Sequence, residues 1–166
     1  TRNNNEVWEI SDWEYYTKDN MIYMPFYNFY QRKPQIWASN TGGNINMAAT
    51  ADVWLSTHVN SYLRYQGGLI KITEVITPRD IKGTVVKGLS GTGKTSDWTE
   101  AAFSDARGWP VSVTFHQNRM VIGGSRDLPN RLWMSKSSDL FNFDLGKALD
   151  DNAIEFGILS DQVNAI

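Results

Sequence analysis

One stretch of the sequence, Gly88 to Thr95, could bind the phosphates of a nucleotide. Its letters, GLSGTGKT, match the phosphate-loop pattern G-x-x-x-x-G-K-S/T at every position. In such a loop the backbone amides surround the phosphates, the lysine (here Lys94) reaches the β and γ phosphates, and the threonine (here Thr95) binds magnesium. The residues that would carry nucleotide binding are therefore Gly88, Gly93, Lys94 and Thr95.

The sequence around this loop argues against nucleotide binding. A phosphate loop opens a long helix that packs on a parallel sheet, but the residues that follow, SDWTEAAFSDARGWP, end in a helix-breaking proline after two or three possible turns. No apolar run ending in aspartate follows to hold the metal, and the neighbouring strand patterns have antiparallel spacing. We therefore interpret residues 88–95 as a flexible loop between two β elements and expect no nucleotide cofactor.

No other set of side chains has the spacing of a catalytic or metal site. The sequence has no cysteine and two histidines, His58 and His116, and neither histidine has partners at metal-binding spacing. The acidic residues between positions 139 and 155 do not fit the twelve-residue calcium loop, and no serine lies in a G-x-S-x-G turn. We expect no catalytic residue, no metal and no cofactor, and hence a protein that is not an enzyme.

The composition supplies a core but no strong charge. The 166 residues are 41% hydrophobic and 13% aromatic, and a net charge of −2 lacks the basic excess that accompanies tight nucleic-acid binding. No apolar run has the length of a signal peptide or membrane segment. The sequence begins without methionine and stops within a strand pattern, so we expect it to be part of a longer protein.

Residues 109–166 are predicted to form an antiparallel β meander. Val113 and Phe115 alternate with polar residues, and three further short strand patterns follow, separated by turn residues. This even spacing is typical of a propeller blade or a sandwich that continues beyond the chain. Arg119 and Asp139 are candidates for an ion pair. The expected core residues are Val113, Phe115, Ile122, Trp133, Phe141, Phe143 and Phe156.

Residues 45–108 are predicted to form a small antiparallel β-barrel or sandwich module that ends in a linker. Gly67-Gly68 is a hairpin signal, and apolar residues alternate through the strand pattern that follows it. Residues 81–87 favour extended backbone, and residues 96–107 are expected to contain a helical turn. The fold class is therefore mainly β.

Residues 1–44 are dense in aromatic side chains but follow neither the helical nor the strand period. Two interpretations fit: core packing of an irregular region, or an arm that packs on a neighbouring subunit. Stacking on single-stranded nucleic acid ranks below both, because basic residues are sparse here. The residues that we expect at a subunit contact are Trp8, Trp13, Tyr15, Tyr16, Tyr27 and Tyr30.

Several short motifs follow one another in a specific order over residues 98–166. They are Trp109-Pro110, FHQNR, Gly123-Gly124, LPNRLWMS, SDLFNF and DDNAIEF. Their order and spacing resemble the nozzle proteins of short-tailed bacteriophages, also called tail tubular protein B or packaged-DNA stabilisation proteins. The resemblance is weaker from about residue 50 and does not extend to the first 45 residues, and Ser138 stands where the family often has glycine.

The resemblance implies a structural protein of the virion tail that is assembled in the cytoplasm of a bacterial host. Nozzle proteins form a hexameric ring below the portal and its adaptor, retain packaged DNA and form the channel for its exit. The implied partners are further copies of this chain, the portal adaptor, other tail proteins and double-stranded DNA. Contact with the DNA is expected to be weak and non-specific, because each neutralised phosphate adds salt-dependent affinity and would slow passage.

Two alternatives to the nozzle interpretation stay open from the sequence. The first is a carbohydrate- or protein-binding β module, whose aromatic side chains would stack on sugars. The second is a phosphate-loop nucleotide-binding protein, which rests wholly on the match between Gly88 and Thr95.

Overall fold

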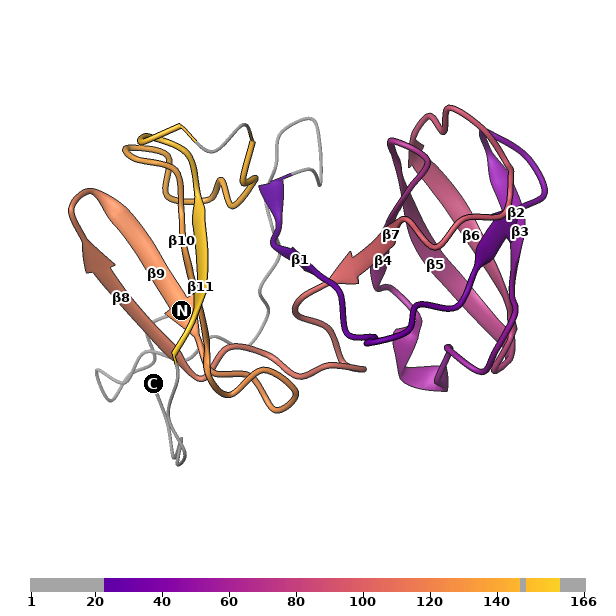
Figure 1. Cartoon of the computed structure of the whole chain (residues 1–166), viewed down its shortest axis with the longest axis horizontal. Helices are drawn as coiled ribbons and strands as arrows, with labels where there is room; N and C mark the ends of the chain where they lie inside the picture. Colours follow the sequence, from indigo (N-terminus) through magenta and orange to yellow (C-terminus); the bar gives the residue numbers. More distant parts are fainter. Residues whose placement is uncertain (1–22, 147–148, 159–166) are drawn as a thin grey trace, which may run out of the picture.

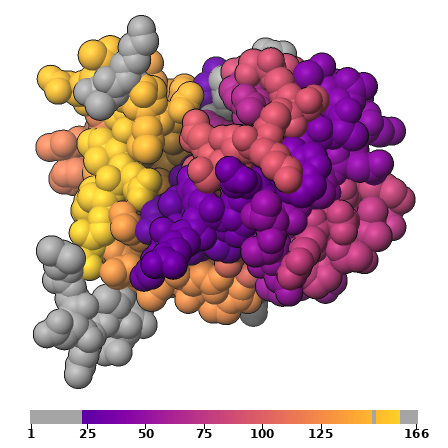
Figure 2. Space-filling view, turned by 45° about the vertical axis from the view of Figure 1, so that its right-hand side comes forward, coloured from indigo at the N-terminus to yellow at the C-terminus, as the bar shows by residue number. Residues whose placement is uncertain are grey.

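The computed structural model describes residues 23–146 and 149–158, which form a mainly β protein with two antiparallel sheets (Figure 1). This confirms the mainly β fold class expected from the sequence. Strand β1 (Phe26–Tyr27), an outermost strand of the larger sheet, lies on the side of that sheet that is toward the smaller one, and the indigo N-terminal part of the described chain runs from one sheet to the other in the space-filling view (Figure 2).

The seven-stranded sheet has the order β1-β7-β4-β5-β6-β3-β2. Its strands are β1 Phe26–Tyr27, β2 Ile36–Ala38, β3 Asn44–Ala49, β4 Tyr62–Tyr65, β5 Gly68–Thr77, β6 Asp80–Lys87 and β7 Trp98–Ala101. An isolated bridge joins Ile36 on the β2 edge to Thr95, just before β7, so the sheet curls on itself. In the part of the chain that the structure describes, this bridge does not complete a closed barrel.

Two local expectations for this region differ from the structure. The boundary expected at residue 44 falls inside the sheet, because β1 pairs with β7 and β2 pairs with β3. The helical turn expected within residues 96–107 lies only at the end of that stretch, where the Arg107 and Gly108 N–H groups donate to the Ser104 carbonyl oxygen. Its start, Trp98–Ala101, forms β7 instead, which pairs with β4. A strand forms at residues 98–101 because side chains two positions apart point to the same face of a strand, which buries both Trp98 and Glu100 on the inner face. The one-turn 3-10 helix η2, Ser56–His58, precedes β4.

The concave side of the seven-stranded sheet holds the first hydrophobic core. Alternate residues of its strands point inward, as the period-two patterns predict. Trp54, from the segment before η2, lies within this core and packs its ring 5.8 Å from that of Trp98, measured between centroids. The buried members include Ile36, Ile45, Met47, Leu63, Tyr65, Ile70, Ile72 and Ile81.

The four-stranded sheet has the order β11-β10-β9-β8. Its strands are β8 Ser112–His116, β9 Arg119–Gly123, β10 Arg131–Met134 and β11 Ile154–Gly157. Gln117 and Asn118 connect β8 to β9 with φ values of 48° and 59°, the left-handed backbone that a two-residue hairpin turn requires. The meander predicted from the sequence is therefore present over the described residues.

A second hydrophobic core lies between this sheet and the β1–β7 end of the first sheet. Trp133 packs edge-on against Phe103, with ring centroids 5.0 Å apart. The other buried members are Met24, Ala101, Ala102, Met120, Ile122, Leu128 and Phe143. Because these residues come from both sheets and from the segment between them, the two sheets share this second core.

The expected core of residues 109–166 is correct in part. Ile122, Trp133 and Phe143 are buried, as expected. The remaining four residues are exposed instead: Val113 by 44%, Phe115 by 66%, Phe141 by 57% and Phe156 by 41%.

Position in the sheet explains most of this difference. Val113 and Phe115 lie on β8, the last strand of the sheet, beyond the reach of the second core. Phe156 pairs with Leu132, so it points to the face opposite the buried Trp133. Phe141 lies in the turn after β10, outside any strand. Alternation within one strand does not reveal which strand lies at an edge.

The expected ion pair between Arg119 and Asp139 is absent. Arg119 is buried and donates to the carbonyl oxygens of Ser135 and Asn152, both at 2.6 Å, and of Asp150 at 2.7 Å. Asp139 instead accepts a hydrogen bond from the Asn142 side chain at 3.1 Å. Arg119 therefore secures the loop that precedes β11.

Candidate functional site

The glycine-rich loop 88–95 connects β6 to β7, and a strand rather than a helix follows it. Lys94 places its Nζ 4.3 Å from the centroid of the Trp37 ring, a cation–π contact. Thr95 exchanges two backbone hydrogen bonds with Ile36, of 3.0 and 3.1 Å. A Cβ added at Gly88 or at Gly93 would meet nothing within 4 Å, so the loop conformation does not need these two glycines for close packing. Lys94 and Thr95 thus pack on β2, and the Gly93 carbonyl oxygen accepts a hydrogen bond from the Tyr65 hydroxyl at 2.7 Å.

A buried group of polar side chains lies where the two sheets meet. Its centre is the Glu100 carboxylate on β7, which is almost fully buried. Arg107 binds it with two donors, Nε to Oε2 at 3.1 Å and Nη2 to Oε1 at 2.7 Å. On the other side, His58 at the end of η2 places Nε2 3.1 Å from Oε2. The buried Glu100 carboxylate and His58 ring are therefore joined to the half-buried Arg107 guanidinium.

The Leu55 backbone fixes the ring of His58. The Leu55 N–H donates to Nδ1 at 2.9 Å, and the Leu55 carbonyl oxygen lies 3.3 Å from the same nitrogen. With Nδ1 accepting from the backbone, Nε2 faces Oε2 of Glu100 as the donor. Glu100 and Arg107 form the ion pair of the group.

Arg107 extends the group to the second sheet. Its Nη2 donates to the Tyr30 hydroxyl at 2.9 Å, and its Nη1 lies 3.5 Å from Oδ2 of Asp127. Its guanidinium lies over the Phe29 ring, 4.2 Å from the centroid. Arg107 thus contacts the N-terminal segment, β7 and the turn before β10.

The pKa values within this group follow from burial and from the partners. Burial alone would raise the pKa of Glu100, but the hydrogen bonds from His58 and Arg107 and the charge of Arg107 outweigh it and lower that pKa. Burial, followed by the nearby Glu100 carboxylate, raises the pKa of Tyr30 to about 12. Burial alone would lower the pKa of Arg107, but its hydrogen bond and charge interaction with Glu100 raise it. At neutral pH the group holds an ionised carboxylate and a guanidinium, and its geometry suits a structural junction.

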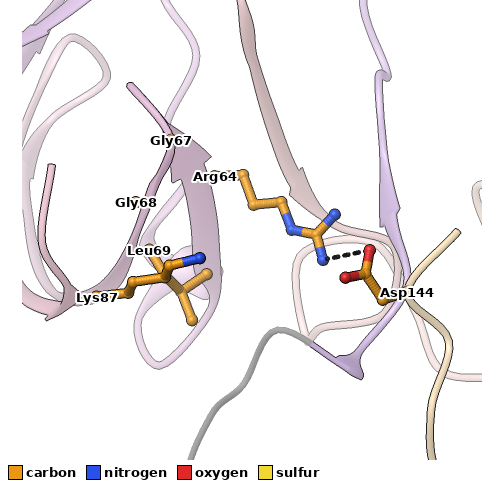
Figure 3. Close-up of a pocket in the computed structure, with 6 residues that line it drawn as sticks. All are labelled: Arg64, Gly67, Gly68, Leu69, Lys87 and Asp144. Carbon is orange, nitrogen blue, oxygen red and sulfur yellow. Dashed lines mark hydrogen bonds and ion pairs between the residues drawn. The ribbon is translucent and has the colours of Figure 1, made fainter. Parts of the chain in front are cut away.

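A second ionic contact crosses the junction at a small hollow of about 260 Å³. Figure 3 shows the Arg64 side chain extending from β4 toward Asp144, whose Oδ1 lies 3.4 Å from Nη2. The Arg64 guanidinium also lies 4.3 Å from the centroid of the Phe26 ring on β1. Burial lowers the pKa of Arg64, although Asp144 opposes this shift. Lys87, Leu69 and the turn at Gly67 and Gly68 complete the lining.

The free edges of the four-stranded sheet carry exposed apolar side chains. The residues that we call the β8 edge are Val111, Val113 and Phe115. The residues that we call the β11 edge are Ile154, Phe156 and Ile158. Within the described chain, β8 pairs only with β9 and β11 pairs only with β10. Exposed edge strands with apolar side chains are templates for pairing with another chain.

The residues expected at a subunit contact divide into two sets. Tyr27 packs its ring 5.1 Å from that of Phe29, and Tyr30 packs 5.3 Å from Trp98, in each case between centroids. Both tyrosines are half-buried by contacts within the chain, so the structure uses them in its two cores. Trp8, Trp13, Tyr15 and Tyr16 lie outside the described residues.

Sequence reasoning missed the buried group around Glu100. His58 and Glu100 are 42 positions apart, and neither lies in a recognisable motif. The available signals were an acidic residue in an alternating stretch, 98–101, and an arginine before Gly108. Among the described residues, no group of three histidine, aspartate or glutamate side chains is placed to hold a metal ion. In the same part of the chain, no helix is long and apolar enough to cross a membrane.

Comparison with known proteins gives no family assignment. No protein-family model matches the chain, and no curated protein matches it. The function is therefore argued from the sequence motifs and from the geometry of the two sheets.

Proposed function

We propose that this chain is a structural subunit of the tail nozzle of a short-tailed bacteriophage, which assembles with its own copies into a ring around the DNA exit channel. The proposal combines the resemblance carried by the motifs of residues 98–166 with one structural observation. That observation is the four-stranded sheet, both of whose edges are apolar and open among the described residues.

Backbone N–H and C=O groups on the outer side of β8 are free to pair with a further strand. The two-residue hairpin pairs His116 with Arg119, and hydrogen-bonded and non-hydrogen-bonded pairs alternate from there. Phe115 and Val113 fall on the non-hydrogen-bonded pairs, so their N–H and C=O groups point away from β9. The same two residues expose large apolar side chains, which would be buried by a neighbouring chain.

The backbone directions of the two edges allow them to pair. The apolar side chains of the β8 edge lie on the Trp133 face of the sheet and those of the β11 edge on the opposite face, so the edges would meet through their backbones. In an antiparallel sheet of four strands, β8 and β11 run in opposite directions. A β8 edge of one copy placed beside the β11 edge of the next therefore continues an antiparallel sheet. Such a contact joins two different surfaces, and repeated contacts of this kind close into a ring when the rotation between copies permits it.

Ring closure also needs a constant shape in each subunit. The shared second core, the buried group around Glu100 and the contact between Arg64 and Asp144 hold the two sheets to each other. The net charge of −2 suits a conduit, because few bound phosphates mean weak, salt-sensitive contact with DNA.

Negative-stain imaging tests this proposal. The protein is imaged alone and after mixing with the portal adaptor of the same phage, and its mass is measured by analytical ultracentrifugation. We expect six-fold rings with a central channel in at least one condition. A monomer in both conditions would overturn the proposed role.

A further inference from the structure

The outer face of the first sheet carries a hollow of about 360 Å³, away from the edges of the second sheet. This volume is at the lower end of the roughly 300–1,000 Å³ that is usual for small-molecule sites, so it suits a ligand of about one ring. The side chains that give the hollow its chemistry are Trp37, Ser39, Asn46, Ala48, Ile76 and Asp80.

The strand register builds the walls and floor of the hollow. Trp37 on β2 lies opposite Ala48 on β3, which lies opposite Asp80 on β6, so all three point to the outer face. The small side chain of Ala48 forms the floor between larger neighbours. A bulge in β5 between Val75 and Thr77 leaves Ile76 exposed as the opposite wall.

The aromatic wall is held in position before any ligand arrives. Lys94 lies over the Trp37 ring, 4.3 Å from its centroid, and Ile36 beside it is bonded to Thr95 on both backbone groups. A side chain that is already ordered loses less conformational entropy on binding. Lys94 of the glycine-rich loop therefore holds the Trp37 ring in position.

The polar lining offers both donors and acceptors. The Ser39 hydroxyl accepts the Asn46 backbone N–H at 2.9 Å, which fixes the end of the hollow. The Asn46 side-chain amide supplies a carbonyl oxygen and two N–H donors. Asp80 accepts one hydrogen bond from Thr77 at 2.8 Å and keeps further acceptor positions on its carboxylate.

The charges around the hollow do not favour a charged ligand. Lys82, opposite Asn46, is paired with Glu74 at 2.8 Å. Lys94 faces the indole, and the only acidic side chain in the lining is Asp80. A ligand with an apolar ring face and several hydroxyl groups matches this combination better than an anion or a cation.

From these features we propose that the hollow binds one ring of a neutral saccharide, stacked on Trp37, with its hydroxyl groups on Asn46 and Asp80. Flat aromatic side chains bury the C–H face of such a ring, while amide and carboxylate groups bind its hydroxyls. This inference concerns the first sheet and is independent of the ring-assembly role proposed for the second.

A glycan array tests the proposal with three proteins: the chain itself, Trp37→Ala, and the control Trp109→Ala. Trp109 is also a partly exposed tryptophan, but it lies near the second sheet with its Nε1 bonded to Asp105. We expect binding of a neutral glycan that weakens about tenfold in Trp37→Ala and is unchanged in Trp109→Ala. A second variant, Ala48→Leu, fills the floor while keeping Trp37, and we expect the same loss.

The site of binding is checked by ¹H–¹⁵N NMR with the glycan that gives the strongest array signal. The Trp37 indole and the Asn46 side-chain amide should shift, while the Trp109 indole should not. Near-UV circular dichroism establishes that each variant is folded. The proposal fails if the array shows no neutral glycan bound, or if the folded Trp37→Ala and Ala48→Leu variants bind as the unaltered chain does.

Discussion

Buried polar partners surround the carboxylate of Glu100. Removing this carboxylate from water costs free energy, and three hydrogen bonds from His58 and Arg107 offset that cost. The bidentate contact with Arg107 is the stronger part, because two charge-assisted hydrogen bonds share one fixed geometry. Replacing Glu100 would leave the half-buried Arg107 with only Tyr30 and the more distant Asp127 as polar partners.

We therefore expect Glu100→Gln to lower the free energy of unfolding by about 3 kcal/mol, as is usual when one partner of a buried ion pair is removed. Urea denaturation followed by tryptophan fluorescence measures this change. The matched control is Glu74→Gln, which removes an exposed ion pair with Lys82 and should cost less than about 1 kcal/mol. Equal effects of the two variants would show that burial of Glu100 adds nothing.

The same carboxylate predicts a dependence of stability on pH. Folding lowers the pKa of Glu100, so its ionisation stabilises the folded state above the usual value of 4.5. As the pH falls below that value and through the lower pKa of the folded state, protonation removes the stabilisation. Urea midpoints at about pH 7 and about pH 3 should therefore differ less in Glu100→Gln than in the unaltered protein. A parallel pH dependence in both proteins would contradict this assignment.

At the scale of elements, position in the sheet decides what an aromatic residue contributes. Trp133 on β10 and Phe115 on β8 belong to the same sheet and were both expected in its core. Trp133 is buried against Phe103, whereas Phe115 is largely exposed on the edge strand. The first removes a large apolar surface from water on folding, and the second does not.

Trp133→Ala is accordingly expected to destabilise the fold by about 3–5 kcal/mol, the range for truncating a buried large aromatic. Phe115→Ala should change the stability of the isolated chain by less than about 0.5 kcal/mol. Thermal unfolding by circular dichroism compares the two. An unchanged transition in Trp133→Ala would place that residue outside the core.

The loop between β6 and β7 shows that a phosphate-loop motif functions only when a helix follows it. A phosphate loop relies on the N-terminus of a following helix, but here the next element is the strand β7 and Lys94 lies over Trp37. We expect no saturable binding of ATP with magnesium in isothermal titration calorimetry, and no difference between the chain and Lys94→Ala. Micromolar binding that disappears in Lys94→Ala would favour the nucleotide-binding alternative.

For the whole molecule, the shared second core makes the two sheets one body with two free edges. We expect the double substitution Val113→Lys and Phe115→Lys to prevent assembly of the protein, because two desolvated cations at a strand edge oppose pairing. The control places lysine at Val86 on β6 and at Leu55 just before η2, which are both exposed and outside the proposed contact. Sedimentation measures the oligomer: rings in the control and monomers in the edge variant are the expected result. Rings in both would move the contact elsewhere while leaving the nozzle role in place.

The sequence by itself determined part of the local structure of this protein. Period-two alternation and turn residues identified β5 and β6 of the first sheet, the strands of the second sheet and the mainly β class, because these signals lie within a few residues of each other, whereas β1, β2 and β7 were not identified. Trp133, Phe143 and Ile122 were correctly assigned to the core for the same reason.

Only the tertiary structure decided which strands lie at an edge and which distant side chains meet. Alternation shows that one face of β8 is apolar, but burial depends on whether another strand or sheet covers that face. The meeting of His58 with Glu100 requires the register of β4 on β7, and the hollow beside Trp37 requires β2, β3 and β6 to align. These are contacts between residues far apart in the chain, and a single sequence carries no local signal of them.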